Sequence, residues 1–272
     1  MGKNYTYVPG AEFPYQYKYE HMAVTVDCVI FTYEDWKLKV LLVRRGGEPY
    51  KGQWAFPGGF LKMKETAEQG ALRELREETS LEPSAVVQLG VFSDVNRDPR
   101  ERVITIAWYA LVKPSKVVGG DDADEAAWFP VDNLPPLAFD HQKIFETAME
   151  QLRRDIHFQP VGFDLLDDDF TIPDLQRLYE IILGVKFDRR NFQRKLLATG
   201  ILENAPDYED AGEMCLESTP APSAVCQEER MMPAEMSMSL SRKSRQGRPG
   251  ILFRLNRKKY EAMKEDGGKM EF

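Results

Sequence analysis

The sequence has little cysteine and no long apolar run. Its three cysteines, Cys28, Cys215 and Cys226, form no C-x-x-C pair, which argues against a zinc ribbon or a disulfide framework and indicates a reducing compartment. No stretch of 18 apolar residues occurs, so we expect no membrane span and a cytoplasmic location.

The sequence also lacks an excess of positive charge, because 36 Lys and Arg stand against 44 Asp and Glu. The formal net charge is -8, so the chain as a whole does not have the electrostatics of a nucleic-acid-binding protein. Any contact with DNA must come from a local basic patch. The remaining composition, 43% hydrophobic and 29% charged, is ordinary for a globular protein. The 272 residues can bury a sizeable core, as one large domain or two of ordinary size.

The first part of the chain alternates strand-like and helix-like segments. Glu34–Lys37 reads as a hairpin turn, and Pro57 with two glycines is expected to end a short strand. Strands are predicted at 23–33, 38–45, 53–59, 85–94, 102–112 and within 125–139, and helices at about 67–79 and 140–156. This alternation predicts a mixed α/β domain that ends near residue 157.

The chain changes character over residues 158–272. Thr171 and Asp188 are candidate N-caps of two short helices, and Gly200 is a stop signal. With strand-like segments at 201–202 and 250–255, they predict a helix-turn-helix followed by a β wing. Residues 205–246 are rich in Pro, Ser, Met, Glu and Ala without a period, so we expect a disordered insertion there.

The stretch from Gly58 to Leu81 places three glutamates on one face of a predicted helix. Glu74 and Glu78 are spaced i,i+4, and Glu77 lies three residues after Glu74. Turned inward, two carboxylates about 4 Å apart repel by roughly 4 kcal/mol at an effective dielectric near 20. Either a cation balances this cost or the face lies in water.

The same stretch matches the pattern G-x5-E-x7-R-E-U-x-E-E-x-G-U, and over about residues 20–157 the chain resembles the Nudix family. The resemblance implies a Nudix domain at 1–157, an α/β/α sandwich on a mixed sheet, and a divalent cation, Mg²⁺ or Mn²⁺, that bridges a substrate diphosphate. Its implied metal ligands are Glu74, Glu77, Glu78 and the carbonyl of Gly58; the implied catalytic residues are Glu77, Glu74 and Arg73; Gly59 and Glu65 are structural. The alternative without a metal is a solvent-exposed helix face with ordinary ion pairs such as Arg73–Glu77.

One position departs from that pattern. Ser80 stands where the Nudix pattern has glycine, at a helix end that needs positive φ. A serine there costs about 1 kcal/mol. Because the glycine contributes no side chain, the departure bears on the helix end and the loop rather than on the chemistry.

No motif fixes a general base. Asp124, Glu125 and the FDH segment at Phe139–His141 are candidates, but a charged turn and a helix-start or surface histidine are the simpler interpretations. The segment SDVNRDPRERV is similar to a stretch of ADP-ribose pyrophosphatases and their regulator relatives, which implies that Arg97, Arg100 and Arg102 face a phosphate or a dimer partner. A charged hairpin turn is the alternative.

The helix predicted at 188–199 concentrates polar and basic residues on one side. Phe192, Leu196 and Leu197 have the spacing to bury its other side. From Arg242 to Lys259 there are eight Lys or Arg and no acid. Such groups neutralise phosphates and read base edges. The candidate DNA contacts are Arg189, Arg190, Asn191, Arg194, Lys195 and Arg248.

A Nudix domain followed by a winged helix resembles the Nudix-related transcriptional regulators of NAD metabolism (the NrtR type). Three functions stay open. The first is a homodimeric regulator on double-stranded DNA that senses ADP-ribose or a related nucleotide sugar, with or without hydrolysis. The second is a Mg²⁺-dependent hydrolase that cleaves ADP-ribose, with an auxiliary C-terminal domain used for dimerisation or packing. The third is a regulator that senses a simple sugar.

Overall fold

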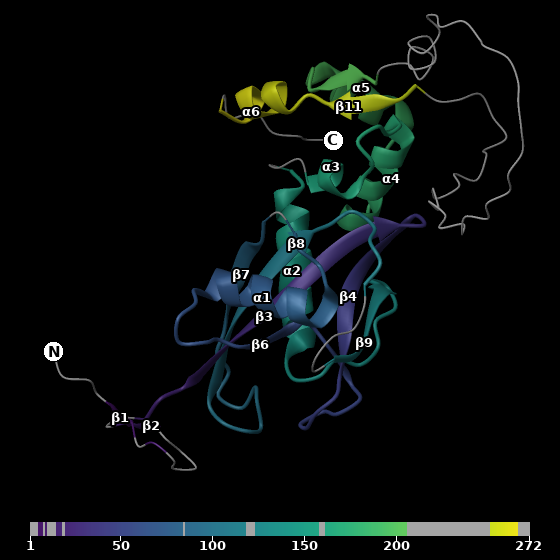
Figure 1. Ribbon diagram of the computed structural model, residues 1–272. Coiled ribbons are helices and arrows are strands. Elements are labelled where there is room, and N and C mark those ends of the chain that lie inside the picture. Colours follow the sequence, from purple (N-terminus) through teal and green to yellow (C-terminus); the bar gives the residue numbers. More distant parts are fainter. Residues whose placement is uncertain are drawn as a thin grey trace, which may run out of the picture.

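The computed structural model describes residues 5–7, 9, 15–17, 20–83, 85–117, 123–157, 161–205 and 251–265. Figure 1 shows a sheet covered by helices, with a smaller, mainly helical module at one end of it. None of the helices in these ranges has the length and apolarity to cross a membrane. Arg248 and nearly all of the predicted insertion at 205–246 lie outside the described residues.

A seven-stranded mixed sheet forms the centre of the first domain among the described residues. Its strands are β3 (Ala23–Glu34), β4 (Lys37–Arg45), β5 (Trp54–Ala55), β6 (Gly58–Phe60), β7 (Val87–Phe92), β8 (Val103–Leu111) and β9 (Ala123–Pro130). The order is β5-β4-β3-β8-β7, with β6 paired to β3 and β9 to β4. Only the β3–β8 pair is parallel in this sheet. A separate hairpin joins β1 (Tyr5–Tyr7) and β2 (Tyr15–Tyr17).

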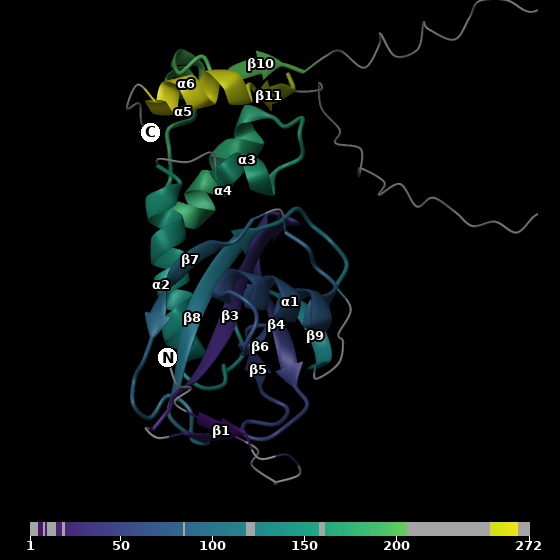
Figure 2. The ribbon, with the colours of Figure 1, turned by 60° about the vertical axis from the view of Figure 1, so that its left-hand side comes forward.

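Two helices, α1 (Ala67–Thr79) and α2 (His141–Asp155), cover opposite faces of the sheet, as Figure 2 shows. Strand side chains alternate between the faces, and β3 is apolar on both. Cys28 and Ile30 belong to the core under α1, whereas Val29 and Phe31 belong to the core under α2. The prediction of an α/β/α sandwich is therefore confirmed.

Local signals placed most element boundaries correctly. Thr66 closes a capping box at the start of α1, and Ser80 ends the helix at φ 60°, in the left-handed region expected for that position. Asp35 and Trp36 both have positive φ, as the tight turn of a two-residue hairpin requires.

One boundary prediction was wrong. The glycines after Pro57 do not end a strand, because Gly58–Phe60 form a new strand, β6, that pairs with β3. A Cβ at Gly58 would overlap the carbonyl oxygen of Val26. The missing side chain is therefore what lets the two backbones meet, a contact that local turn signals do not reveal.

The C-terminal module is a winged helix. It contains α3 (Val161–Leu165), α4 (Ile172–Leu183), α5 (Arg189–Ala198), β10 (Leu202–Asn204), β11 (Phe253–Leu255) and α6 (Arg257–Glu265). Thr171 and Asp188 cap α4 and α5 as predicted. β10 and β11 pair antiparallel across 48 intervening residues of sequence.

The prediction for the buried side of α5 was partly wrong. Phe192 and Leu196 are buried, but Leu197 is 43% exposed. Residues 192 and 196 are one helical turn apart and define the packed face, whereas residue 197 lies about 100° further round the helix.

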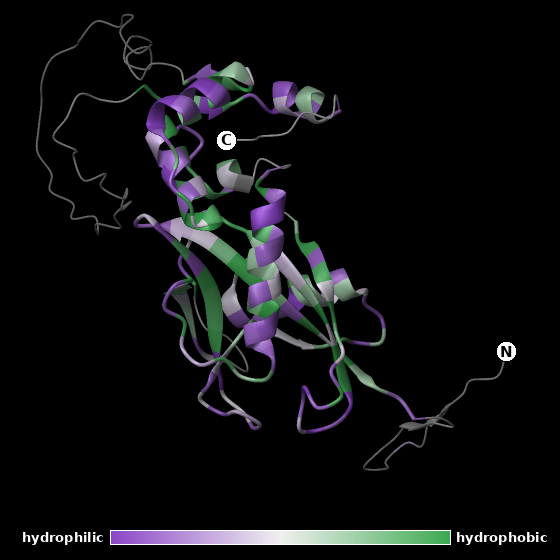
Figure 3. Cartoon of the chain, turned by 180° about the vertical axis from the view of Figure 1, so that it is seen from behind, coloured by the Kyte–Doolittle hydropathy of each residue, from purple (hydrophilic) through white to green (hydrophobic). Residues whose placement is uncertain are grey.

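The two domains share a continuous apolar core. One cluster of buried side chains runs from Phe31 in the sheet through Leu152 of α2 to Tyr179 and Tyr260 in the winged helix. Figure 3 shows α2 with its polar side outward over the apolar strands. Polar contacts reinforce this packing, since Arg153 Nε of α2 donates to the carbonyl of Ile182 in α4 at 3.1 Å.

Candidate functional site

The Nudix-box arginine is surrounded by carboxylates. Arg73 donates to both oxygens of Glu65, at 2.9 and 2.6 Å, and its Nη1 donates to Glu74 at 2.7 Å and to Glu77 at 2.9 Å. The cation that offsets the repulsion between the glutamates is therefore Arg73. Its hydrogen bonds lower the pKa of Glu65 to about 2, whereas burial raises the pKa of Glu74. The side chain of Glu74 is thus the more easily protonated of the two.

The glycines of the box allow the preceding loop to lie close to α1. The backbone N–H of Gly58 donates to Oε2 of Glu78 at 2.9 Å. A Cβ on Gly59 would lie 2.5 Å from Oε1 of Glu74, closer than real side chains come. A substitution at Gly59 would therefore displace Glu74 or the loop, which supports the structural role proposed for this glycine.

The three helix glutamates are not gathered around a single point. Within the described residues, no group of three or more His, Cys, Asp or Glu is arranged to hold a metal ion. Two of the carboxylates bind Arg73 and that of Glu78 binds the Gly58 backbone. The donor set nevertheless fits a hard divalent cation, because all three are carboxylates on one helix face. Coordination would require Glu74 and Glu77 to exchange Arg73 for the metal, and Glu78 to exchange the Gly58 backbone N–H.

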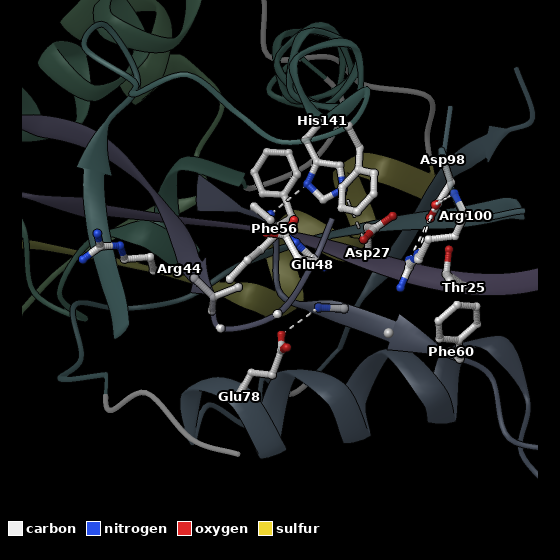
Figure 4. A pocket seen from close by; sticks show the side chains of 18 of the residues that line it. Thr25, Asp27, Arg44, Glu48, Phe56, Phe60, Glu78, Asp98, Arg100 and His141 are labelled. Carbon is white, nitrogen blue, oxygen red and sulfur yellow. Dashed lines mark hydrogen bonds and ion pairs between the residues drawn. The ribbon is translucent and has the colours of Figure 1, made fainter. Parts of the chain in front are cut away.

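A cavity of about 590 Å³ opens beside Glu78. Figure 4 shows side chains from several elements pointing into it, with Glu78 on one side and His141 on the other. Four arginines line this cavity among acidic, aromatic and glycine residues: Arg44, Arg45, Arg97 and Arg100. It is large enough for a small ligand, and its polar lining favours one that carries charge.

A buried polar cluster lies at the base of the cavity. Arg97 donates to both oxygens of Asp140, at 3.0 and 2.7 Å, and lies 3.7 Å from Asp27. Thr105 Oγ1 donates to Asp27 at 2.6 Å. All four come from different segments of the chain, so only the fold brings them together. The cluster holds the wall of the cavity in one arrangement.

His141 adds a neutral imidazole to this cluster. Its Nδ1 accepts a hydrogen bond from the backbone N–H of Phe56 at 2.9 Å, so the ring proton resides on Nε2, 3.6 Å from Oδ1 of Asp27. Burial lowers the pKa of His141. It starts α2, as one interpretation held, but it is 3% exposed, so the surface interpretation is wrong.

The other two candidate bases do not share this position. The side chain of Glu125 is 54% exposed and 4.0 Å from Arg44, and it is absent from the cavity lining. The side chain of Asp124 lies outside the described part of the structure. Of these three, His141 alone is seen to line the cavity. Its Nδ1 already accepts from Phe56 and its Nε2 carries the ring proton, so this arrangement offers no free nitrogen for a general base.

The three arginines of the 97–102 segment have separate environments. Arg97 and Arg100 line the cavity, whereas Arg102 is not among the lining residues and donates to the carbonyls of Ser93 and Asp94. Arg100 makes two hydrogen bonds to Asp98, at 3.0 and 2.7 Å. A phosphate in the cavity could meet Arg97 and Arg100, but each already has a carboxylate partner.

The predicted DNA-binding side chains lie together on α5. Arg189, Arg190, Arg194 and Lys195 are exposed, and Asn191 is partly exposed. Arg194 donates to Oδ1 of Asn191 at 2.7 Å. Among the described residues no ion pair engages the four cations of this helix. Within the described residues, the helix therefore presents its positive charge to solvent without a carboxylate partner.

Sequence reasoning missed Asp27 and Arg45 as parts of the site. A signal existed for Asp27, which is the single charged residue in the apolar run AVTVDCVIF. An aspartate is almost never fully buried unless it is paired, so its place in this run indicates a buried partner. Asp140 lay within the segment Phe139–His141 that was considered for a general base, but its pairing with Arg97 was not predicted. Arg45 stands at the end of an ordinary amphipathic strand, where nothing local distinguishes it.

Comparison with known proteins agrees with both domains. The chain matches the NUDIX domain over residues 21–148 and the NrtR DNA-binding winged helix domain over residues 162–213. It is 45% identical over 131 residues to an ADP-ribose pyrophosphatase of Methanocaldococcus jannaschii, a match that covers 48% of this chain and 75% of that protein. An ADPR-responsive transcriptional repressor of Acinetobacter baylyi is 28% identical over 200 residues, which are 72% of this chain and 80% of the repressor.

A solved structure shares the two-domain arrangement. The NrtR of Shewanella oneidensis, crystallised with a 27mer DNA, superimposes with a TM-score of 0.62 and 28% identity, over 88% of this chain and 95% of that one. The chain therefore belongs to the Nudix family, and it joins a NUDIX domain to a winged helix domain of the NrtR DNA-binding type.

Proposed function

We propose that the chain is a cytoplasmic, DNA-binding transcriptional regulator whose Nudix cavity binds ADP-ribose or a related nucleotide sugar. The observation that carries this proposal is the packing of an arginine-lined cavity and an exposed basic helix onto one continuous core. The A. baylyi relative, a repressor that responds to ADPR, supports it across 72% of the chain. A simple neutral sugar fits less well, because it would leave Arg45, which has no described carboxylate partner, without an anion.

On the DNA side, α5 is the proposed recognition helix. Arg189, Arg190 and Asn191 lie in its first turn, where side chains can reach base edges, and Arg194 and Lys195 can neutralise phosphates. Arg248 is proposed as a further phosphate contact. We propose a homodimer, since two such helices would read two half-sites one helical turn of DNA apart.

The α2 helix offers a route from ligand to DNA. It starts at His141 in the cavity wall and ends at Asp155, about 22 Å away at 1.5 Å per residue. Near that end Arg153 bonds to α4, and Arg177 of α4 lies 4.8 Å from the ring of Trp36 at the β3–β4 turn. A ligand that shifts α2 would therefore shift α4, and a change of half-site spacing would release the DNA.

The test is a fluorescence-anisotropy titration of the full chain with DNA from upstream of its own and neighbouring genes. We expect one fragment to bind more tightly than random DNA, and ADP-ribose to release it, while AMP serves as the control ligand. Binding to no fragment above random DNA at low salt would exclude the regulator and leave the hydrolase.

The Nudix box is proposed to bind a divalent cation, Mg²⁺ or Mn²⁺. Glu74, Glu77, Glu78 and the carbonyl of Gly58 would hold it, and Arg73 would orient the glutamates. When bound, such a cation neutralises a diphosphate and lowers the pKa of a coordinated water. The residues of this chain would supply the anchoring, and Glu65 keeps Arg73 in place.

A thermal-unfolding experiment tests the metal site separately from activity. Mg²⁺ or Mn²⁺ relieves carboxylate repulsion, so it should raise the melting temperature of the wild type and not that of Glu78→Gln. Glu82→Gln is the matched control, because Glu82 pairs with Arg76 on an exposed surface. An equal rise in Glu78→Gln and wild type would mean that Glu78 binds no metal.

A second candidate function is ADP-ribose hydrolysis to AMP and ribose 5-phosphate. The 45% identity to the M. jannaschii pyrophosphatase favours it, as does the complete set of box glutamates. Hydrolysis and sensing can occur in one chain. Wild-type protein that binds ADP-ribose in the presence of Mg²⁺ without turning it over would reject the hydrolase and keep the sensor.

A further inference from the structure

The four arginines that line the cavity differ in how their charge is balanced. Arg97 is held by Asp140, Arg100 by Asp98, and Arg44 lies 4.0 Å from Glu125. Arg45 forms no ion pair with any carboxylate that the structure describes. The side-chain hydrogen bond of Arg45 among the described residues runs from Nε to the carbonyl of Pro49 at 2.8 Å. Within the part of the chain that the structure describes, its two terminal nitrogens are therefore unused donors.

The surroundings of Arg45 make an uncompensated charge costly. The residue is partly buried, and burial together with the nearby Arg100 lowers the pKa of its guanidinium. The carboxylates of Glu78, Asp98 and Asp27 act on it only from a longer range. A partly desolvated cation next to a second one gains most from a bound anion.

The ring of Phe139 positions this guanidinium. Cζ of Arg45 lies 4.8 Å from the centre of the ring, and Tyr50 packs edge-on against the same ring with 4.8 Å between the ring centres. Phe139 has φ 53°, a conformation that is strained for a bulky residue. The neighbouring residues hold it there, since Ala138 N–H bonds to the carbonyl of Trp54 and Asp140 is fixed by Arg97. Strain of this kind persists where a side chain has a required place.

Arg45 lines the same cavity as residues of the Nudix box. Gly58 and Glu78 line it together with Arg45, so a ligand near the box glutamates has this arginine within the same enclosed space. A guanidinium offers two parallel N–H donors that match the oxygens of a phosphate. Because Arg97 and Arg100 are committed to carboxylates, Arg45 is the cavity arginine best suited to receive an anion.

We propose that Arg45, positioned by Phe139 and the carbonyl of Pro49, is the residue that binds the diphosphate of the ligand. This inference rests on the proposed function, because it assigns the anion site for the nucleotide sugar. It also assigns the phosphate contact to the end of β4, whereas the sequence had suggested the segment of residues 97–102. Arg97 and Arg100 then shape the wall of the cavity through their own carboxylates.

The experiment is isothermal titration calorimetry of the full chain with ADP-ribose and, separately, with inorganic pyrophosphate, without added metal so that no turnover occurs. Arg45→Met removes the charge at similar length, Arg45→Lys keeps the charge but loses the forked donor, and Arg76→Met is the matched control on an exposed part of α1. Melting temperatures without ligand verify that each variant is folded.

We expect Arg45→Met to bind ADP-ribose roughly 10- to 100-fold more weakly than wild type. Arg45→Lys should recover part of that loss, and Arg76→Met should bind as wild type. Equal affinity of wild type and folded Arg45→Met for ADP-ribose would overturn the assignment of Arg45 and leave the proposed function standing.

Pyrophosphate separates the two hypotheses if wild type does not bind ADP-ribose. In that case the proposed ligand is wrong. Binding of pyrophosphate to wild type but not to Arg45→Met would still support Arg45 as an anion site. Absence of pyrophosphate binding to wild type as well would overturn it.

Discussion

The arginines of the Nudix domain and those of the winged helix are held in opposite ways. Arg73, Arg97 and Arg100 each make at least two hydrogen bonds to carboxylates. The cations of α5 extend into solvent without a described ion pair. A cavity for a small ligand needs fixed groups, because their ordering cost is met on folding. A DNA backbone offers many phosphates, which long solvated side chains can follow.

Arg45 stands between these two classes. It is partly buried like the paired arginines, yet it has no described carboxylate partner, like the cations of α5. The contrast shows that the exposure of an arginine and the pairing of an arginine are separate properties. An arginine that binds an anion in a cavity needs low exposure and no carboxylate partner. The predictions below test each side of this contrast, beginning with the largest effect.

Salt should affect the two regions very differently. With about eight phosphate contacts per dimer, DNA affinity should fall by on the order of 10³–10⁴ between about 50 and 200 mM salt. ADP-ribose carries few charges and would bind in the cavity under the proposed function, so its affinity should change far less. Anisotropy and calorimetry over this salt range measure the two. If the affinities for DNA and for ADP-ribose fell equally steeply with salt, the two regions would not differ in the way described.

The carboxylates of the Nudix box, which are held by Arg73, are tested by measuring the hydrolysis of ADP-ribose. If the domain hydrolyses ADP-ribose with Mg²⁺, Glu77→Gln should slow AMP formation by at least about 10²-fold, because it removes a group of the box from metal binding or proton transfer. Glu68→Gln, in the exposed first turn of α1, should behave as wild type. A Glu77→Gln variant with full activity would remove Glu77 from the site.

The free cations are tested at Arg190. Its replacement by Ala should weaken specific DNA binding by roughly 1–3 kcal/mol if the side chain reaches a base edge, and binding of ADP-ribose should not change. Arg76→Ala removes the same charge from the Nudix domain and should leave DNA affinity intact. Anisotropy with the specific fragment gives the comparison, and equal losses in both variants would point to net charge alone.

The smallest effect concerns how helices end in the two domains. α1 ends in Ser80 at φ 60°, whereas α4 ends in Gly184 at φ 69°. Ser80→Gly should therefore raise the free energy of unfolding by about 0.5–1 kcal/mol, seen as a melting temperature a few degrees higher. Gly184→Ala should lower stability by a similar amount, since nothing crowds its Cβ and only backbone strain remains. A less stable Ser80→Gly would show that serine makes a compensating contact.

Much of the fold followed from short-range signals. The caps at Thr171 and Asp188 bond to backbone N–H groups three residues away, and the turn at Asp35 needs only local backbone geometry. The glutamate face of α1 follows from helical spacing alone. Such features depend on residues within one turn of each other, so the sequence predicts them directly.

Contacts between segments far apart in the sequence could not be predicted as well. The β6 strand, the burial of His141 and the exposure of Leu197 depend on which elements pack against them. Local patterns state what a segment can do, and they do not state which neighbour it will meet. Tertiary contacts override such preferences.

The amino-acid sequence by itself determined the two-domain organisation. It also determined the carboxylate face of α1, which includes Arg73, and the basic face of α5, because each of these faces arises from residues a few positions apart on one helix. Only the tertiary structure decided which arginines are neutralised. Arg97 meets Asp140 across 43 positions, while Arg45 meets the ring of Phe139 but no described carboxylate. Charge balance in a cavity is set by distances of a few ångströms between distant segments, and those distances exist only after the sheet, α2 and their loops have packed.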